Sequence, residues 1–151
     1  MNDKLTHIDK QGRARMVDVG SKPPMRRTAV AEGFFCAAGR TLDMLEAGEL
    51  PKGEALAVAR VAAIQAAKKC DELIPLCHQL PLDVVVVDFD RAGTDRLRIE
   101  ATVSTTARTG VEMEALTAVA VAALTLWDMT KAVDKDLRVE GIRVVSKVKG
   151  G

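Results

Sequence analysis

The segment from residue 84 to residue 105 constrains the fold more than any other part of the sequence. It opens with Val84–Phe89, a β-branched run that favours a strand. The turn-forming stretch Arg91–Asp95 follows, and apolar and polar residues then alternate over Arg96–Thr105. The apolar members of this alternation are Leu97, Ile99, Ala101 and Val103. The segment is therefore predicted to form a β-hairpin with one buried face.

Two long helical segments flank this hairpin. Gly53–Lys69 is rich in alanine and places its apolar residues on neighbouring turns, and Val111–Val133 is the longest helical segment. Outside them, Thr28–Phe35 and Val139–Val145 are predicted to be strands. The order strand, helix, strand, strand, helix, strand predicts an α+β fold. It is the ferredoxin-like split βαβ arrangement, an antiparallel sheet packed by two long helices.

The remaining segments are shorter or irregular. An extra short helix is predicted over Thr41–Ala47, with Thr41 as its cap and Gly48 as its stop. Residues 1–26 hold no sustained period, so we expect an irregular or mobile N-terminal arm, in which Met16–Val19 could form a short strand. Residues 27–151 then form a single domain that ends in a basic tail after Val145. Because helices would cover only one face of the sheet, we expect an oligomer.

Composition excludes several classes of protein. The 151 residues include 22 Lys and Arg against 21 Asp and Glu, and aromatic residues are 3%, so the sequence does not favour a nucleic-acid-binding protein. The longest apolar stretch, Ala115–Trp127, is too short to cross a bilayer, and we expect no membrane partner. Three cysteines are too few for a disulfide scaffold, and the polar N-terminus lacks the apolar run of a signal peptide. We therefore expect a cytoplasmic protein with reduced thiols.

The pair Asp128 and Lys131 is the first candidate for chemistry. The two residues are three apart and share one face of a helix that is otherwise almost uncharged from Ala115 to Trp127. At the end of a buried helix they are expected to be partly desolvated, which would suit the amine to acid or base work. The alternative is a surface ion pair that stabilises the helix by about 0.3 kcal/mol.

The loop Leu76-Cys77-His78 is the second candidate, because prolines bracket it and hold the imidazole in reach of a ligand. The alternative is a solvated loop histidine beside a buried cysteine. A zinc site built from Cys70, Cys77 and His78 is less favoured, since the sequence holds no CxxC motif and its other histidine, His7, lies in the arm.

Charged residues at other segment boundaries complete the candidates. Glu112 and Glu114 could hydrogen-bond the N–H edge of a guanine-like or pterin-like ring, or could simply complement the helix dipole. Basic residues recur at segment ends, and several of them would form a polyphosphate site if they converged on one pocket. They are Arg26, Arg27, Lys52, Lys68, Lys69, Lys147 and Lys149. No GxxxxGK[ST] or GxGxxG motif is present, so neither ordinary nucleoside triphosphate hydrolysis nor dinucleotide binding is supported.

Several motifs together resemble the cyclic pyranopterin monophosphate synthase family, the molybdenum cofactor biosynthesis protein C family. They are Thr6-His7-Ile8-Asp9, Met16-Val17-Asp18-Val19, Ala66-Ala67-Lys68-Lys69, Glu72-Leu73-Ile74-Pro75-Leu76-Cys77-His78, Thr109-Gly110-Val111-Glu112-Met113-Glu114-Ala115-Leu116-Thr117 and Asp128-Met129-Thr130-Lys131-Ala132-Val133. The resemblance implies a lyase that converts (8S)-3′,8-cyclo-7,8-dihydroguanosine 5′-triphosphate to cyclic pyranopterin monophosphate and diphosphate. It also implies a ferredoxin-like catalytic subunit in a homohexamer, a trimer of dimers with sites at subunit interfaces.

The resemblance also assigns roles residue by residue. The expected catalytic residues are Asp128, Lys131 and Lys52. The expected substrate-binding residues are Leu76, Cys77, His78, Glu112, Met113, Glu114, Arg27 and Lys147. No cofactor or resident metal is expected, although Mg²⁺ could accompany the triphosphate.

Four positions depart from the family pattern. They are Gln79 in place of Pro, Cys70-Asp71 in place of Thr and a small or variable residue, Trp127 in place of Tyr, and Thr130 in place of Cys. Since every charged site residue remains, we expect these changes to alter packing rather than activity. The rival hypothesis is a non-catalytic regulatory oligomer that binds a nucleotide at its interface, which would need the basic anchors but not a desolvated Asp128–Lys131 pair.

Overall fold

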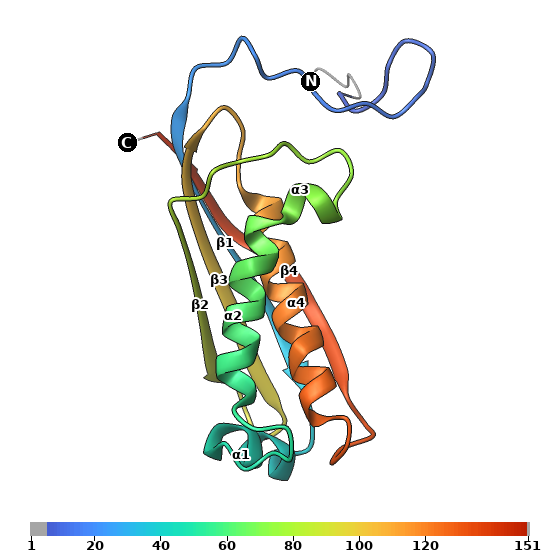
Figure 1. The fold of residues 1–151 in the computed structure, drawn as a ribbon, viewed down its shortest axis with the longest axis vertical. Helices are drawn as coiled ribbons and strands as arrows, with labels where there is room; N and C mark the ends of the chain where they lie inside the picture. Colours follow the sequence, from blue (N-terminus) through green and yellow to red (C-terminus); the bar gives the residue numbers. More distant parts are fainter. Residues whose placement is uncertain (1–5, 151) are drawn as a thin grey trace.

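The computed structural model describes residues 6–150 and contains one four-stranded antiparallel sheet with its helices on one face (Figure 1). The strands are β1 (Met25–Cys36), β2 (Val84–Arg91), β3 (Arg96–Ala107) and β4 (Arg138–Lys149). The helices are α1 (Gly39–Ala47), α2 (Ala55–Lys68), α3 (Cys70–Leu73) and α4 (Glu112–Thr130). The sheet order β2-β3-β1-β4, with every neighbouring pair antiparallel, confirms the ferredoxin-like split βαβ prediction.

The predicted alternation in β3 is confirmed by burial. Leu97, Ile99, Ala101 and Val103 are at most 1% exposed and face the helices. The hairpin partner β2 pairs Val84 with Ser104 and Val87 with Ala101, as the sequence order requires. Small residues let the helices come close to the sheet: a Cβ on Gly33 of β1 would lie 2.7 Å from Cγ1 of Val119 in α4, so this contact requires glycine.

The helix α4 is long and apolar enough to cross a membrane by length and composition alone. In the fold, however, 56% of its apolar window is buried, with Ala115, Ala118, Ala122 and Leu126 fully enclosed. It packs against α2 and the sheet, in the manner of the core helix of a globular domain. The buried alanines on α2 and α4 bring the two helix backbones close together.

Several predicted boundaries were wrong. Thr41 does not cap α1, because the helix begins at Gly39 after Ala38, and the Thr41 hydroxyl instead donates to Asp134 Oδ2 at 2.8 Å. Gly48 does end α1, in the left-handed conformation with φ 70°. The helix α4 ends at Thr130, three residues earlier than predicted.

Both ends of the chain also differ from the prediction. Met16–Val19 forms no strand, and the part of the arm that the structure describes, residues 6–24, is irregular apart from one bridge between Ile8 and Ala14. The basic segment after Val145 is not a tail. It belongs to β4, in which Lys147 pairs with Ala29 and Lys149 pairs with Arg27 of β1.

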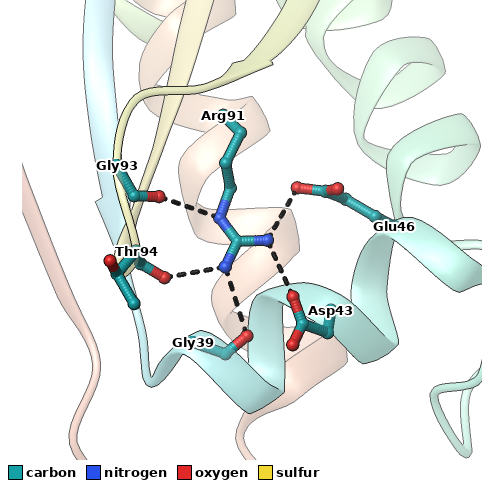
Figure 2. Close-up of polar contacts among 6 residues, drawn as sticks. All are labelled: Gly39, Asp43, Glu46, Arg91, Gly93 and Thr94. Carbon is teal, nitrogen blue, oxygen red and sulfur yellow. Dashed lines mark hydrogen bonds and ion pairs between the residues drawn. The ribbon is translucent and has the colours of Figure 1, made fainter.

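One charged cluster fastens α1 to the β2–β3 turn (Figure 2). The Arg91 guanidinium forms ion pairs with Asp43 at 3.0 Å and Glu46 at 3.1 Å. It also donates to the backbone carbonyls of Gly39, Gly93 and Thr94. Every nitrogen of the guanidinium therefore already donates to a partner within the protein, so none is left to bind a ligand.

Candidate functional site

The predicted site residues fall into two groups at opposite ends of α4. Glu112, Met113 and Glu114 lie on its first turn, whereas Asp128 and Lys131 lie at its end. Glu112 and Asp128 are separated by 16 positions of one helix, and a rise of about 1.5 Å per residue places their backbones about 24 Å apart. One chain therefore does not bring the predicted catalytic and substrate-binding residues together.

A pocket of about 330 Å³ lies beside the first turn of α4. The α3–β2 loop contributes Leu76, Cys77 and His78 to its wall, and α4 contributes the acidic turn. The N-terminal arm closes the opposite side. The lining residues are Thr6, His7, Val17, Val19, Lys22, Leu76, Cys77, His78, Leu80, Thr109, Gly110, Glu112, Met113 and Glu114. Six of the eight predicted substrate-binding residues thus share one cavity.

A second pocket, of about 250 Å³, adjoins the first through Gly110 and Glu112. Its other walls include Arg27 of β1 and Lys147 of β4, which are neighbours because β1 and β4 pair. The Lys147 ammonium lies 3.5 Å from Glu112 Oε1. The remaining two predicted substrate-binding residues, Arg27 and Lys147, therefore meet here as a basic patch.

Arg27 keeps an unused donor in this second pocket. Its Nη2 donates to the Arg108 carbonyl at 3.4 Å, but its buried Nε has no hydrogen-bond partner in the described part of the chain. A buried donor without a partner costs free energy. Gly110, which lines both pockets, leaves room for the Glu112 carboxylate, since a Cβ at this position would lie 2.5 Å from Glu112 Oε2.

His78 is held by the arm. Its Nε2 is within hydrogen-bond distance of the Val17 carbonyl, so the ring donates from Nε2 to the arm backbone. The imidazole is half-buried, and the prolines on either side of its loop limit the loop's freedom. The arm therefore determines how this histidine faces the pocket.

Glu114 is the most deeply buried charged side chain of the group, at 3% exposure. It takes part in no ion pair among residues 6–150. Burial raises the pKa of this carboxyl to about 7, and the nearby Glu112 and Asp71 charges add to the effect. Near neutral pH the group can therefore either donate or accept a proton within the pocket.

At the other end of α4, Asp128 lies between two ammonium groups. Lys131 Nζ is 2.8 Å from Oδ1 and Lys52 Nζ is 3.2 Å from Oδ2, so the loop before α2 contributes to this cluster as well. Hydrogen bonds from Lys131 and Lys52 lower the pKa of the Asp128 carboxyl. The predicted desolvation was wrong for the single chain, because all three side chains are 44–57% exposed. Shielding these three side chains from water requires contact with a surface that the single chain does not provide.

Sequence reasoning assigned no role to several residues that the fold brings to the first pocket. Lys22 and Thr109 line it, and His7 reaches it from the arm, although the arm carries no sustained period. Cys70 also lies next to Cys77, with their sulfurs 3.9 Å apart. The sequence raised this pair only as part of a less favoured zinc site with His78, and its pattern did not predict the short helix α3 on which the contact depends.

Comparisons with known proteins all match this chain to one family. A model of the MoaC family matches residues 16–150. A protein of Novosphingobium aromaticivorans named cyclic pyranopterin monophosphate synthase is 56% identical over 151 residues, covering 100% of this chain and 94% of that protein. Proteins of the same name from Chloroflexus aggregans and Corynebacterium efficiens are also 56% identical, over 99% and 97% of this chain and 90% and 94% of their own lengths.

Proposed function

The chain belongs to the MoaC family, and from that premise we propose that it is a cyclic pyranopterin monophosphate synthase of molybdenum cofactor biosynthesis. Such a lyase acts on a small molecule. The substrate is (8S)-3′,8-cyclo-7,8-dihydroguanosine 5′-triphosphate, and the products are cyclic pyranopterin monophosphate and diphosphate.

The observation that carries this proposal is the pair of adjoining pockets at the start of α4, one basic and one acidic. Arg27 and Lys147 would bind the triphosphate from the sheet side, where both residues line the second pocket, and His78 would contribute from the loop. Glu112 and Glu114 would hydrogen-bond the N–H edge of the base. Leu76, Cys77 and Met113 would form the remaining contacts with the ring.

Asp128, Lys131 and Lys52 would carry the proton transfers that open the bridged ring, rebuild it as a pyranopterin and close the cyclic phosphate. Each oxygen of the Asp128 carboxylate is paired with one ammonium group, and these contacts orient the two lysines. Each ammonium keeps its other protons for proton transfer. General acid–base groups positioned in this way contribute about 10²–10⁴-fold to a rate.

The separation of about 24 Å along α4 prevents one nucleotide from reaching both groups of one chain. We therefore infer that each active site forms between copies, with the Asp128 end of one chain facing the pockets of another. Exposed apolar residues on the helix layer support such contacts, because a monomer rarely leaves them uncovered together. They are Val58, Val61, Leu124 and Trp127.

The assembly proposed is a homohexamer, a trimer of dimers, in the cytoplasm. Its members need no resident cofactor for the acid–base steps described. A Mg²⁺ ion would enter as part of the triphosphate substrate, and carboxylates are the ligands that it prefers. Turnover with and without a chelator of divalent cations tests that requirement directly.

The experiment that tests the function uses the purified protein and the cyclised guanosine triphosphate. We expect diphosphate release together with formation of cyclic pyranopterin monophosphate. The Asp128→Asn variant keeps the shape of the side chain but removes its charge, and it should release neither product at a comparable rate. Absence of turnover in a correctly assembled wild-type protein, or full turnover in the variant, would contradict the proposal.

The second candidate, a non-catalytic nucleotide-binding oligomer, is favoured only by the exposure of the Asp128 cluster in the single chain. It predicts stoichiometric binding of the substrate with no diphosphate released. The same experiment therefore separates the two functions.

A further inference from the structure

Three potential metal ligands lie close together at the wall of the first pocket. Cys70 begins α3, Cys77 lies in the loop that follows it, and Glu114 reaches them from the first turn of α4. The two sulfurs are 3.9 Å apart, and they and a carboxylate oxygen of Glu114 all lie within 4.8 Å of one another. The group is recruited from two separate parts of the chain, so the fold itself has to assemble it.

The spacing of the sulfurs suits a tetrahedral ion. Two thiolates bound at about 2.3 Å on a tetrahedral zinc ion lie about 3.8 Å apart, close to the 3.9 Å between Cys70 and Cys77. A disulfide would instead require about 2.05 Å, and both cysteines are free. The pair is therefore arranged for a shared cation without further movement of the loop.

The chemistry of the ligand set selects the class of ion. Thiolates favour zinc and other thiophilic ions over Mg²⁺ and Ca²⁺, which take oxygen ligands. In the metal-free protein, burial raises the pKa of the Cys77 thiol to about 12, and the pKa of the Cys70 thiol is raised for the same reason. Each thiol would release its proton to solvent as its sulfur bonds to the metal, and the divalent cation would offset two of the three negative charges of the ligand set.

We propose that Cys70, Cys77 and Glu114 form a binding site for a zinc ion, with the fourth coordination position open to water from the pocket. Cys77 and Glu114 also line the pocket assigned to the substrate, so bound zinc excludes the substrate. This competition rests on the proposed function, whereas zinc binding itself does not. His78, the third ligand in the zinc alternative raised by the sequence, is instead bonded to Val17.

Cys70 is the one proposed ligand that does not line the first pocket. Its sulfur contacts the Thr117 hydroxyl at 3.4 Å, a contact that serine can keep. Cys70→Ser therefore removes one soft ligand while it leaves the substrate-binding residues in place. Cys36→Ser is the matched control, because Cys36 is also a buried thiol with a raised pKa, but lies at the end of β1 beside Arg138 and Glu140.

The first experiment titrates zinc into the assembled protein in competition with a chromogenic chelator. We expect one zinc ion per chain, and a loss of affinity of at least about 100-fold in Cys70→Ser and in Cys77→Ser, with Cys36→Ser unchanged. Cobalt(II) should show a thiolate charge-transfer band in wild type that is reduced in Cys70→Ser. Equal zinc affinity in wild type and Cys70→Ser, or an equal loss in Cys36→Ser, would overturn the site.

The second experiment adds zinc to the turnover assay. Zinc should raise the apparent KM of wild type for the cyclised triphosphate, and Cys70→Ser, with wild-type turnover in metal-free buffer, should resist it. If zinc binds but leaves KM unchanged, the proposed competition between zinc and the substrate for this pocket is wrong. If no variant turns over at all, the proposed function fails, and the chelator titration still decides whether the zinc site exists.

Discussion

The two ends of α4 differ in how deeply their charged side chains are buried and in how those charges are paired. At its first turn Glu114 is 3% exposed, has no ion-pair partner among the described residues, and lines the first pocket. At its last turn Asp128 is ion-paired on both oxygens but more than half exposed. The first end therefore combines a pocket with a carboxyl that titrates near neutral pH, whereas the second end presents exposed, ion-paired charges. In the function proposed above, each end is half of one site.

The Arg91 cluster shows what a purely structural arrangement looks like (Figure 2). All of its guanidinium nitrogens are used by Asp43, Glu46 and three backbone carbonyls. The end of α4 that carries Asp128 lies at the same end of the fold as α1 (Figure 1). In the Asp128 cluster the side chains of Lys52 and Lys131 are 44% and 57% exposed. This difference predicts that substitutions in the two clusters affect different properties of the protein.

The largest effect is expected at the Asp128 end. Lys131→Ala should reduce turnover by about 10²–10⁴-fold while the fold remains intact, because a general acid–base group is lost. Lys131→Arg should also be poor, since a guanidinium does not release its proton near neutral pH. The measurement is kcat, with circular dichroism as the control. Near-normal turnover in Lys131→Arg would reduce the role of Lys131 to a fixed charge.

At the other end, Glu114 should make stability depend on pH. Its carboxyl ionises near 4.5 when unfolded and near 7 when folded. Between these values the folded state keeps a proton that the unfolded state has lost, so the free energy of unfolding falls as pH rises. Relative to Glu114→Gln, wild type should lose up to about 3 kcal/mol across this window.

Denaturant unfolding of both proteins at several pH values, at one protein concentration, measures this difference. Parallel pH profiles for wild type and Glu114→Gln would mean that the Glu114 carboxyl is solvated or paired in the assembled protein. The contrast between the two ends of α4 would then disappear.

Substrate binding should weaken when the pocket residues are changed. His78→Ala and Arg27→Ala should each cost about 1.5–3 kcal/mol, the value of a hydrogen bond to a charged group. Calorimetry with an inert triphosphate analogue measures the loss, and Lys131→Ala serves as the comparison with near-normal binding. Wild-type affinity in both pocket variants would remove these residues from the phosphate site.

The smallest effect is expected in the structural cluster. Arg91→Lys keeps the charge but loses the fork that reaches two carboxylates and three carbonyls. It should lower the free energy of unfolding by about 1–2 kcal/mol and leave kcat and KM unchanged. A change in kcat in fully folded Arg91→Lys protein would break the distinction between the two clusters.

Local patterns predicted the fold well where one face of an element is buried. The alternation from Leu97 to Val103 and the alanine-rich helix α2 were both confirmed. Prediction failed where a distant residue decides the outcome. Thr41 bonds to Asp134, 93 positions away, instead of capping α1. Lys147 lies in β4 because β1 supplies its hydrogen-bonding partner, which a charged terminal sequence does not reveal.

For the site, residue chemistry was easier to predict than exposure. The motifs identified which charged residues to examine, and the geometry brings Arg27, Glu112 and Lys147 to one pocket. Exposure depends on which surfaces meet, and the sequence suggested a buried Asp128 because its helix is apolar. In one chain that end of the helix faces solvent. The sequence already placed Glu112 at the start and Asp128 near the end of one helix, and the structure adds which loops and strands meet at each end.

In the proposed active site, the two ends of α4 act together across copies of the chain. Lys131→Ala and His78→Ala subunits, each inactive alone at limiting substrate, can be unfolded together and reassembled as a mixture. If the halves come from different chains, about a quarter of the sites regain both wild-type residues and activity rises toward that fraction. A mixture of Lys52→Ala and Lys131→Ala should stay inactive, because both lysines bind one Asp128. No activity from a fully assembled Lys131→Ala and His78→Ala mixture would contradict the account.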